Sequence, residues 1–173
     1  MPGNGGIPIA EKLIHTISPV YDENSRVLIL GSFPSPKSRE YGFFYGHPQN
    51  RFWKVLAAVL EKPLPRTNEE KHAFLLENGI ALWDVLHACE IEGASDASIA
   101  APEPNDLSPI LSAAKIRAVF TTGGTAAKLY KRHIQPAVGR EAIPLPSTSP
   151  ANCARSFESL CESYRVIQNY LED

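Results

Sequence analysis

Two neighbouring stretches of the chain carry residue types that could bind a ligand and act on it. The first is the turn Gly31-Ser32-Phe33-Pro34-Ser35, which directly follows the apolar run Val27 to Leu30. Ligands of open α/β sheets bind at the carboxyl ends of strands, so this turn is predicted to form the floor of a site. The second stretch is a loop rich in aromatic residues, Tyr41, Phe43, Phe44 and Tyr45. Because a loop cannot bury all of these rings, at least one is expected to stack on a planar ligand.

The aromatic loop continues into His47-Pro48-Gln49-Asn50, and a helix is predicted to begin at Arg51. The imidazole of His47 can move a proton, whereas the amide of Asn50 has no basic pKa and acts through hydrogen bonds. Asn50 also fits the N-cap position of the helix that follows. A serine hydrolase would pair a serine of the preceding turn with His47. That alternative lacks a Gly-x-Ser-x-Gly turn and an acidic residue assigned to orient the histidine.

Four short apolar runs predict the strands that would position these residues: Val27 to Leu30, Ile80 to Trp83, Ala118 to Thr121, and a run near Glu141 to Leu145. Helical segments alternate with them, which predicts parallel strands joined by right-handed crossovers. The strand ends then face one groove. They bring to it Ser32 to Ser35, Trp83-Asp84, Thr122 to Gly124 and Ser147 to Asn152.

The rest of the chain is expected to support this sheet. Apolar residues at helical spacing predict a helix within Ile7 to Ile17, and Thr67 to Glu70 has the form of a capping box for a helix that ends at Gly79. The segment Glu92 to Asn105 is predicted to be an irregular surface connection, and Arg155 to Leu171 a closing helix.

Composition favours one α/β domain. With 173 residues, 43% of them hydrophobic, the chain fits a single three-layer domain over residues 1–173, with a central four-stranded parallel sheet flanked by helices and a flexible tail at residues 1–6. The three cysteines show no Cys-x-x-Cys spacing, which favours a reducing cytoplasm over structural zinc or an iron–sulfur cluster. No apolar stretch reaches the ~18 residues of a membrane span. We therefore expect a cytoplasmic protein without metal, cofactor or membrane partner.

Four segments together resemble the uracil-DNA glycosylase superfamily, and most of all its hypoxanthine-DNA (deoxyinosine) glycosylases of family 6. They occur in the expected order, across residues 26–170, as Gly31-Ser-Phe-Pro-Ser35, Tyr45-Gly-His-Pro-Gln-Asn-Arg-Phe-Trp-Lys54, Leu82-Trp-Asp-Val85 and Leu145-Pro-Ser-Thr-Ser-Pro-Ala-Asn152. The resemblance implies a monofunctional glycosylase that hydrolyses the N-glycosidic bond of a deaminated base, above all hypoxanthine, in base excision repair. A mismatch-specific uracil or thymine glycosylase, which shares the His-Pro-x-Asn-Arg-Phe-Trp segment, and a non-catalytic nucleotide- or nucleic-acid-binding module are the alternatives.

The same resemblance implies roles for individual residues. Asn50 matches the catalytic asparagine of the hypoxanthine-type branch and would orient water through its carbonyl. His47 would donate to the departing base or brace the loop. Tyr45 matches the stacking aromatic residue of related enzymes, with Phe33 or Phe44 as alternates. Gly31, Ser32 and Pro34 would complete the base pocket. The residues expected at the DNA backbone or in the gap left by the flipped base are Ser35, Ser147, Thr148, Ser149, Asn152 and Arg155.

Charge and residue type also bear on the ligand. The net charge of −2 requires a DNA-binding protein to concentrate positive charge locally, and Lys37, Arg39, Arg51 and Lys54 cluster around the predicted site. Phe33 stands where several branches of the superfamily have Asn or Asp, which implies a roomier pocket that is read by stacking and backbone groups. Hypoxanthine is therefore the expected base, released from DNA by a monomeric enzyme that needs no metal.

Overall fold

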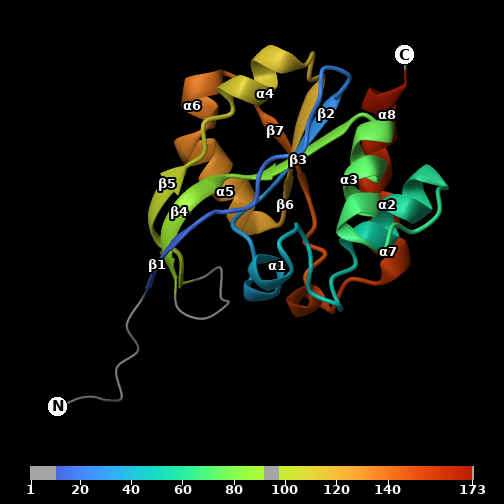
Figure 1. The fold of residues 1–173 in the computed structure, drawn as a ribbon, viewed down its shortest axis with the longest axis horizontal. Coiled ribbons are helices and arrows are strands. Elements are labelled where there is room, and N and C mark those ends of the chain that lie inside the picture. Colours follow the sequence, from blue (N-terminus) through green and yellow to red (C-terminus); the bar gives the residue numbers. More distant parts are fainter. Residues whose placement is uncertain (1–10, 92–97, 173) are drawn as a thin grey trace.

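A four-stranded parallel sheet forms the centre of the computed structural model, which describes residues 11–91 and 98–172. The sheet order is β3-β2-β6-β7, with bounds of Ile80–Asp84, Val27–Gly31, Ala118–Thr122 and Ala142–Leu145 (Figure 1). All neighbouring pairs in it are parallel. The predicted sheet is thus confirmed, strand by strand. The tail predicted at residues 1–6 lies outside the described residues.

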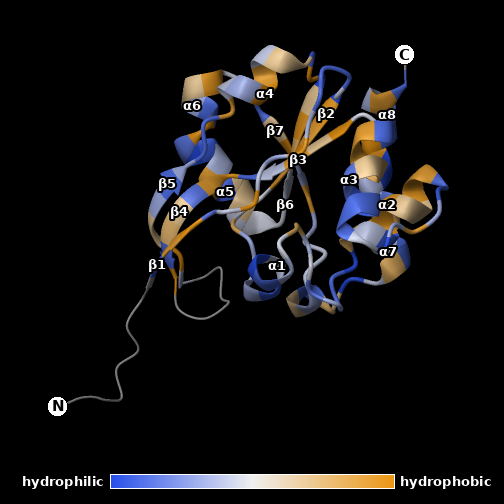
Figure 2. Cartoon of the chain, in the orientation of Figure 1, coloured by the Kyte–Doolittle hydropathy of each residue, from blue (hydrophilic) through white to orange (hydrophobic). Residues whose placement is uncertain are grey.

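Helices cover both faces of this sheet, as predicted. On one face lie α2 (Phe52–Leu60), α3 (Asn68–Glu77), α7 (Phe157–Tyr164) and α8 (Gln168–Leu171). On the other lie α4 (Ser108–Ala113), α5 (Gly124–His133) and α6 (Gln135–Val138). Because side chains alternate across a strand, Ile29 packs into the first layer and Leu28 into the second, and both are fully buried. Figure 2 shows this apolar centre, with hydrophilic residues on the outer faces of the helices.

A second, antiparallel sheet was not predicted. Its order is β1-β4-β5, with bounds of Glu11–Ile14, Leu86–Ile91 and Ala100–Pro104. The helix predicted within Ile7 to Ile17 is therefore wrong over its described part, because the backbone of this segment pairs with β4 over four residues. The irregular connection predicted at Glu92 to Asn105 is wrong at β5, and its residues 92–97 lie outside the described residues. Long-range pairing overrides local propensity in both places.

Local capping explains the remaining elements. The polar loop after β2 contains the short helix α1 (Pro36–Tyr41), whose N-cap hydroxyl, on Ser35, accepts from the Ser38 amide. The capping box of α3 is present as predicted, and Gly79 follows the helix end with a φ of 72°. The predicted closing helix is interrupted by the 3₁₀ turn Arg165–Ile167. Within residues 11–91 and 98–172, no helix is long and apolar enough to cross a membrane.

Candidate nucleic-acid site

A cleft of about 980 Å³ opens at the carboxyl ends of the parallel strands. It is lined by the turn after β2, by α1, by the aromatic loop, by the Gly turn after β6 and by the Pro146–Asn152 segment after β7. Every residue proposed from the sequence for catalysis, base binding or DNA contact lines this cleft, with the exception of Arg155. Convergence of strand ends, which follows from parallel topology, brings these distant segments together.

The aromatic loop divides its rings between the core and the cleft. Phe43 and Phe44 are buried, at 8% and 2% exposure, whereas Tyr41 is 48% exposed. Tyr45 is half-buried and lines the cleft, with its ring stacked on Phe52 at a centroid distance of 3.8 Å. Its hydroxyl bonds to Oγ1 of Thr122 at 2.9 Å. Tyr45 is therefore a braced ring with one face packed against α2, and of the rings Tyr45, Phe33 and Phe44 it is the most exposed at the cleft.

Asn50 is held by two hydrogen bonds to the same side-chain oxygen. Oδ1 accepts from the Phe52 amide at 2.9 Å and from the Thr148 hydroxyl at 2.8 Å. Because both partners donate, the side-chain amide can adopt only one orientation, with its oxygen toward them. The two bonds use both lone pairs of Oδ1. The predicted N-cap position is wrong by one residue, because α2 begins at Phe52 and its N-cap is Arg51, but Asn50 still accepts from the first amide of the helix. Nδ2 is the group of Asn50 that remains for a ligand.

The Pro146–Asn152 segment is anchored from within the protein. The hydroxyl of Tyr164, whose pKa is raised by burial, donates to the Pro146 carbonyl at 2.7 Å. The Asn152 side chain donates to the Ser147 carbonyl at 2.8 Å. Thr148 is only 1% exposed, and its hydroxyl is bound to Asn50 instead of being presented to the phosphate predicted as its partner. Ser147 and Ser149 lie at the cleft, half-buried.

Arg51 and Arg155 act inside the fold. The Arg51 guanidinium donates to the carbonyls of Arg155 and Asn152 at 2.7 and 3.0 Å, so it fastens the end of the Pro146–Asn152 segment to α2. The Arg155 guanidinium donates to Ser163 Oγ at 2.7 Å, on α7, which turns it away from the cleft. Of the predicted cationic cluster, Lys37 and Arg39 line the cleft.

His47 is half-buried at the cleft rim. Its Nδ1 accepts from the Gln49 amide at 3.0 Å, which assigns the proton of the neutral ring to Nε2. The histidine thus braces its own loop through one nitrogen while the other can donate to a ligand. The two roles proposed for it from the sequence are compatible.

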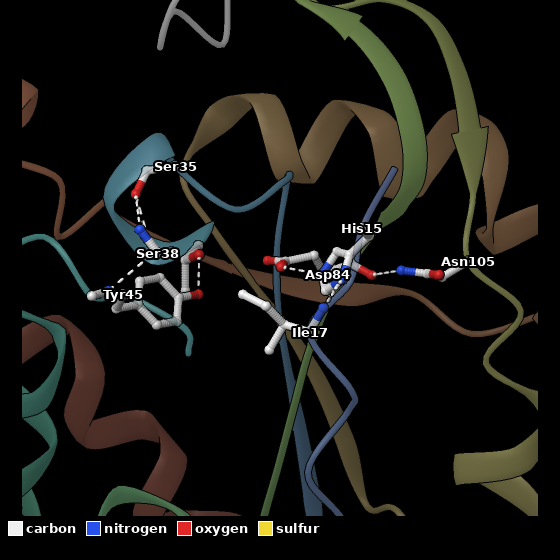
Figure 3. A network of polar contacts seen from close by, with 9 residues as sticks. His15, Ile17, Ser35, Ser38, Tyr45, Asp84 and Asn105 are labelled. Carbon is white, nitrogen blue, oxygen red and sulfur yellow. Dashed lines mark hydrogen bonds and ion pairs between the residues drawn. The ribbon is translucent and has the colours of Figure 1, made fainter. Parts of the chain in front are cut away.

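An unpredicted pair lies at the floor of the cleft. Asp84, the last residue of β3, is 4% exposed and accepts from His15 Nε2 at 2.8 Å, and its backbone carbonyl accepts from the Asn105 side chain (Figure 3). Asp84 could have been selected from the sequence as a site residue, because it is an acidic residue at the end of a predicted strand. His15 carried no such signal, because it lies in the segment predicted to be helical and reaches Asp84 only through the pairing of β1 with β4.

The comparisons with known proteins agree with this architecture. The family model described as the uracil DNA glycosylase superfamily matches residues 18–172. A protein of Methanosarcina acetivorans named hypoxanthine DNA glycosylase is 38% identical over 146 residues, which cover 83% of this chain and 90% of that protein. A protein of the same name from Methanosarcina barkeri is 36% identical over 142 residues, which cover 82% and 89%.

A solved structure is also similar. It is the solution NMR structure of a Methanosarcina acetivorans protein described as a candidate uracil DNA glycosylase, and it superposes with a TM-score of 0.74. The two chains are 32% identical, with 89% of this chain and 98% of the other covered. The match of the family model across the sheet and all the cleft segments confirms the resemblance read from the sequence. This chain belongs to the uracil DNA glycosylase superfamily.

Proposed function

We propose that this protein is a monofunctional DNA glycosylase that removes hypoxanthine from deoxyinosine-containing DNA. The observation that carries the proposal is the convergence, in one cleft, of a fixed amide on Asn50, a braced ring on Tyr45 and a loop of hydroxyl groups at Ser147 and Ser149. The names of the two Methanosarcina relatives support the same activity.

The reaction must begin with extrusion of the nucleotide, because a stacked base cannot reach a cleft at the ends of the strands. Flipping costs a few kcal/mol, and the cost is lower for a mispaired base such as hypoxanthine. Stacking on an aromatic ring contributes about 1–3 kcal/mol per base, which offsets much of that cost. Tyr45 is proposed to supply this contact, with Phe33 at the pocket floor.

Hydrolysis then breaks the bond between C1′ of the deoxyribose and N9 of the base. The bonding electron pair leaves with hypoxanthine, water adds its oxygen to C1′ of the oxocarbenium-like sugar, and the two protons of that water are shared between the abasic sugar and the free base. Donors aimed at the departing base lower the barrier, since negative charge develops there. Asn50 Nδ2 and His47 Nε2 are the proposed donors.

This assignment changes the role expected for Asn50 from the sequence. Its carbonyl already accepts two hydrogen bonds, so orientation of water through that oxygen would require one of them to be lost. Donation from Nδ2 requires no such loss. Stabilisation of the leaving base is therefore the role that the local hydrogen bonds favour.

The proposal also covers the oligomeric state, the location and the metal dependence of the enzyme. The enzyme acts as a monomer on damaged DNA in the cytoplasm and needs no metal ion. Lys37 and Arg39, on α1 at the cleft, are proposed to meet DNA phosphates in a protein whose net charge is −2. A stronger salt dependence of DNA binding in wild type than in Lys37→Ala would support this contact.

The test is single-turnover excision on identical duplexes that each contain one deoxyinosine, deoxyuridine or mispaired thymidine, with chelator present. Faster release of hypoxanthine than of the other bases supports the proposal. Faster release of uracil or thymine would make the protein a mismatch-specific pyrimidine glycosylase. Absence of alkali-labile sites on every duplex, with DNA binding retained, would make it a binding module.

A further inference from the structure

The pair formed by His15 and Asp84 is a buried ionisable pair at the cleft that the steps described above do not use. His15 is 8% exposed and Asp84 4%, and they lie 69 positions apart in the sequence. In Figure 3 the Asp84 side chain extends from β3 toward the side on which Ser38 and Tyr45 lie. Burying a carboxylate is costly unless its oxygens are hydrogen-bonded, so its place beside a binding cleft calls for a ligand that donates.

The hydrogen bonds of His15 define its tautomer. Nδ1 accepts from the Ile17 backbone amide at 3.2 Å, so this nitrogen carries a lone pair. The proton of the neutral ring is then on Nε2, which donates to Asp84 Oδ2 at 2.8 Å. A neutral histidine that donates to Asp84 leaves the carboxylate its negative charge. Asp84 is thereby an acceptor for a ligand and cannot be a donor.

The second carboxylate oxygen of Asp84 faces the space above Gly31. A Cβ atom placed on Gly31 would lie 2.5 Å from Asp84 Oδ1, 3.1 Å from the Tyr45 hydroxyl and 3.6 Å from Thr122 Oγ1. Three oxygen atoms from three elements therefore lie close to Gly31 at the strand end, and only glycine lets Asp84 Oδ1 approach the backbone this closely. Gly31 and Asp84 both line the cleft, so this contact holds the carboxylate at the edge of the space that a base would enter.

We propose that Asp84 Oδ1 accepts a hydrogen bond from the lactam N–H of the flipped base, and that His15 holds the carboxylate in position to do so. Deamination of adenine changes N1 from an acceptor into an N–H donor, and deamination of cytosine does the same at N3. A fixed anionic acceptor recognises this shared product of deamination and repels the lone pair of the parent base. The proposal rests on the proposed function and names the group that reads the lesion.

The negative charge of Asp84 serves recognition and opposes charge on the departing base. Stabilisation of the leaving group must therefore come from other parts of the cleft, where Asn50 and His47 supply donors. Base recognition and leaving-group stabilisation are thus assigned to different parts of the chain. Asp84 ends β3, whereas Asn50 and His47 come from the loop before α2.

The experiment compares duplexes with deoxyinosine and with 1-methyldeoxyinosine, in which a methyl group replaces the N1 hydrogen. Wild type is expected to excise hypoxanthine at least about tenfold faster, because a hydrogen bond to a charged group is lost from the methylated base. In Asp84→Ala the rate on deoxyinosine should fall and the ratio of the two rates should approach one. Asp84→Asn, which can present an amide donor in place of Oδ1, should lose at least about tenfold on deoxyinosine. Asp106→Asn, which alters a carboxylate that accepts from the Ser108 amide at the start of α4, is the matched control and should match wild type.

His15 is tested as a positioning residue. His15→Phe keeps an aromatic ring beside Phe33 but removes the donor to Asp84, and it should lower the ratio of the two rates. His15→Gln, whose amide can replace Nε2–H, should restore much of it. If His15 were merely structural, both rates would fall by the same factor and the ratio would stay as in wild type, which would overturn its assignment.

Binding gives a readout that needs neither turnover nor a variant. Wild type should bind a duplex with uncleavable 2′-fluorinated inosine at least about tenfold more tightly than one with its 1-methyl analogue. Equal binding, or an excision ratio unchanged in folded Asp84→Ala, would overturn the proposal. A binding preference without excision of hypoxanthine would instead overturn the proposed function and leave the assignment of Asp84 standing.

Discussion

Thr148 donates its hydroxyl hydrogen to Oδ1 of Asn50 at 2.8 Å, across a separation of 98 residues. The backbone carbonyl of Thr148 also accepts from the Arg51 amide at 3.1 Å. The segment after β7 and the start of α2 are thus joined by two hydrogen bonds, one at Asn50 and one at the next residue, Arg51. The orientation of the Asn50 amide therefore depends on a contact between segments that are far apart in the sequence.

Substitution of Asn50 separates its two candidate roles. Asn50→Asp keeps an oxygen for the Phe52 amide and the Thr148 hydroxyl but loses the Nδ2 donor, so we expect single-turnover excision to fall about as far as in Asn50→Ala. A loss of ~1 kcal/mol in unfolding free energy is expected for Asn50→Ala alone, because the hydrogen bonds from the Phe52 amide and the Thr148 hydroxyl are removed. Activity of Asn50→Asp at or above the wild-type rate would return the water-orienting role to the carbonyl.

Thr148→Val should lower excision although it touches no substrate atom. Valine fills about the same volume, so the change removes one of the two hydrogen bonds that orient the Asn50 amide and leaves the bond from the Phe52 amide. We expect a rate loss of about tenfold and a stability loss of ~1 kcal/mol. Thr148→Ser, which keeps the hydroxyl, is the control. Equal rates for the two variants would show that the orientation of Asn50 does not depend on Thr148.

Tyr45→Ala should weaken binding to lesion-containing duplex by about 1–3 kcal/mol, the contribution of one stacked base. Tyr45→Phe retains the ring on Phe52 and loses the hydroxyl bond to Thr122, so its affinity should stay close to wild type. Fluorescence anisotropy with uncleavable substrate measures both. Should the alanine variant bind as tightly as wild type, the stacking contact belongs to Phe33 or Phe44.

Gly31→Ala should impair excision by displacing the Asp84 carboxylate. The new Cβ would lie 2.5 Å from Asp84 Oδ1, a distance that forces the carboxylate or the strand end to move. Single-turnover rates on deoxyinosine should fall at least about tenfold if a hydrogen bond to charged Asp84 is lost. Gly139→Ala, at a turn remote from the cleft, controls for loss of glycine, although its φ of 69° adds backbone strain. A wild-type rate in Gly31→Ala would contradict the role proposed for Asp84 Oδ1.

Alkaline unfolding tests the anchor of the Pro146–Asn152 segment. Burial raises the pKa of Tyr164 in the folded state, so its contribution to stability is complete below the unfolded pKa of about 10 and declines as pH rises above it. Tyr164→Phe should cost ~1 kcal/mol near neutral pH, from the bond to Pro146, and should show a weaker decline above pH 10. Tyr130 and Cys161, whose pKa values are also raised by burial, remain in both proteins and contribute to the residual decline. Identical pH profiles of unfolding would contradict this account.

Local chemistry decides which parts of the fold could be predicted. The strands of the parallel sheet are continuous apolar runs, and the capping box of α3 is a four-residue pattern, so both can be read without knowledge of the rest of the chain. β5 contains two prolines in five residues, which opposes a strand, and forms only because β4 lies beside it. β4 follows β3 after a single residue, Val85, without a turn signal.

The candidate site was likewise predictable only where local sequence decides the structure. The cleft segments were predictable because each follows a strand end, whereas side-chain direction was not. Arg155 turns toward α7, Thr148 turns inward to Asn50, and His15 reaches Asp84 from another sheet. Each of these directions depends on a partner at least eight positions away in sequence, and hydrogen bonds over such separations have no local pattern.

Two side chains that hold Asp84 follow strands of the antiparallel sheet: His15, after β1, donates to its carboxylate, and Asn105, after β5, donates to its backbone carbonyl. β1 is an edge strand of four residues, and short edge strands open locally at a lower free energy than the whole domain unfolds. Opening of β1 would withdraw His15 while the parallel sheet stayed folded. Lesion discrimination would then fade on warming before the protein melts, in step with amide hydrogen exchange in Lys12 and Leu13.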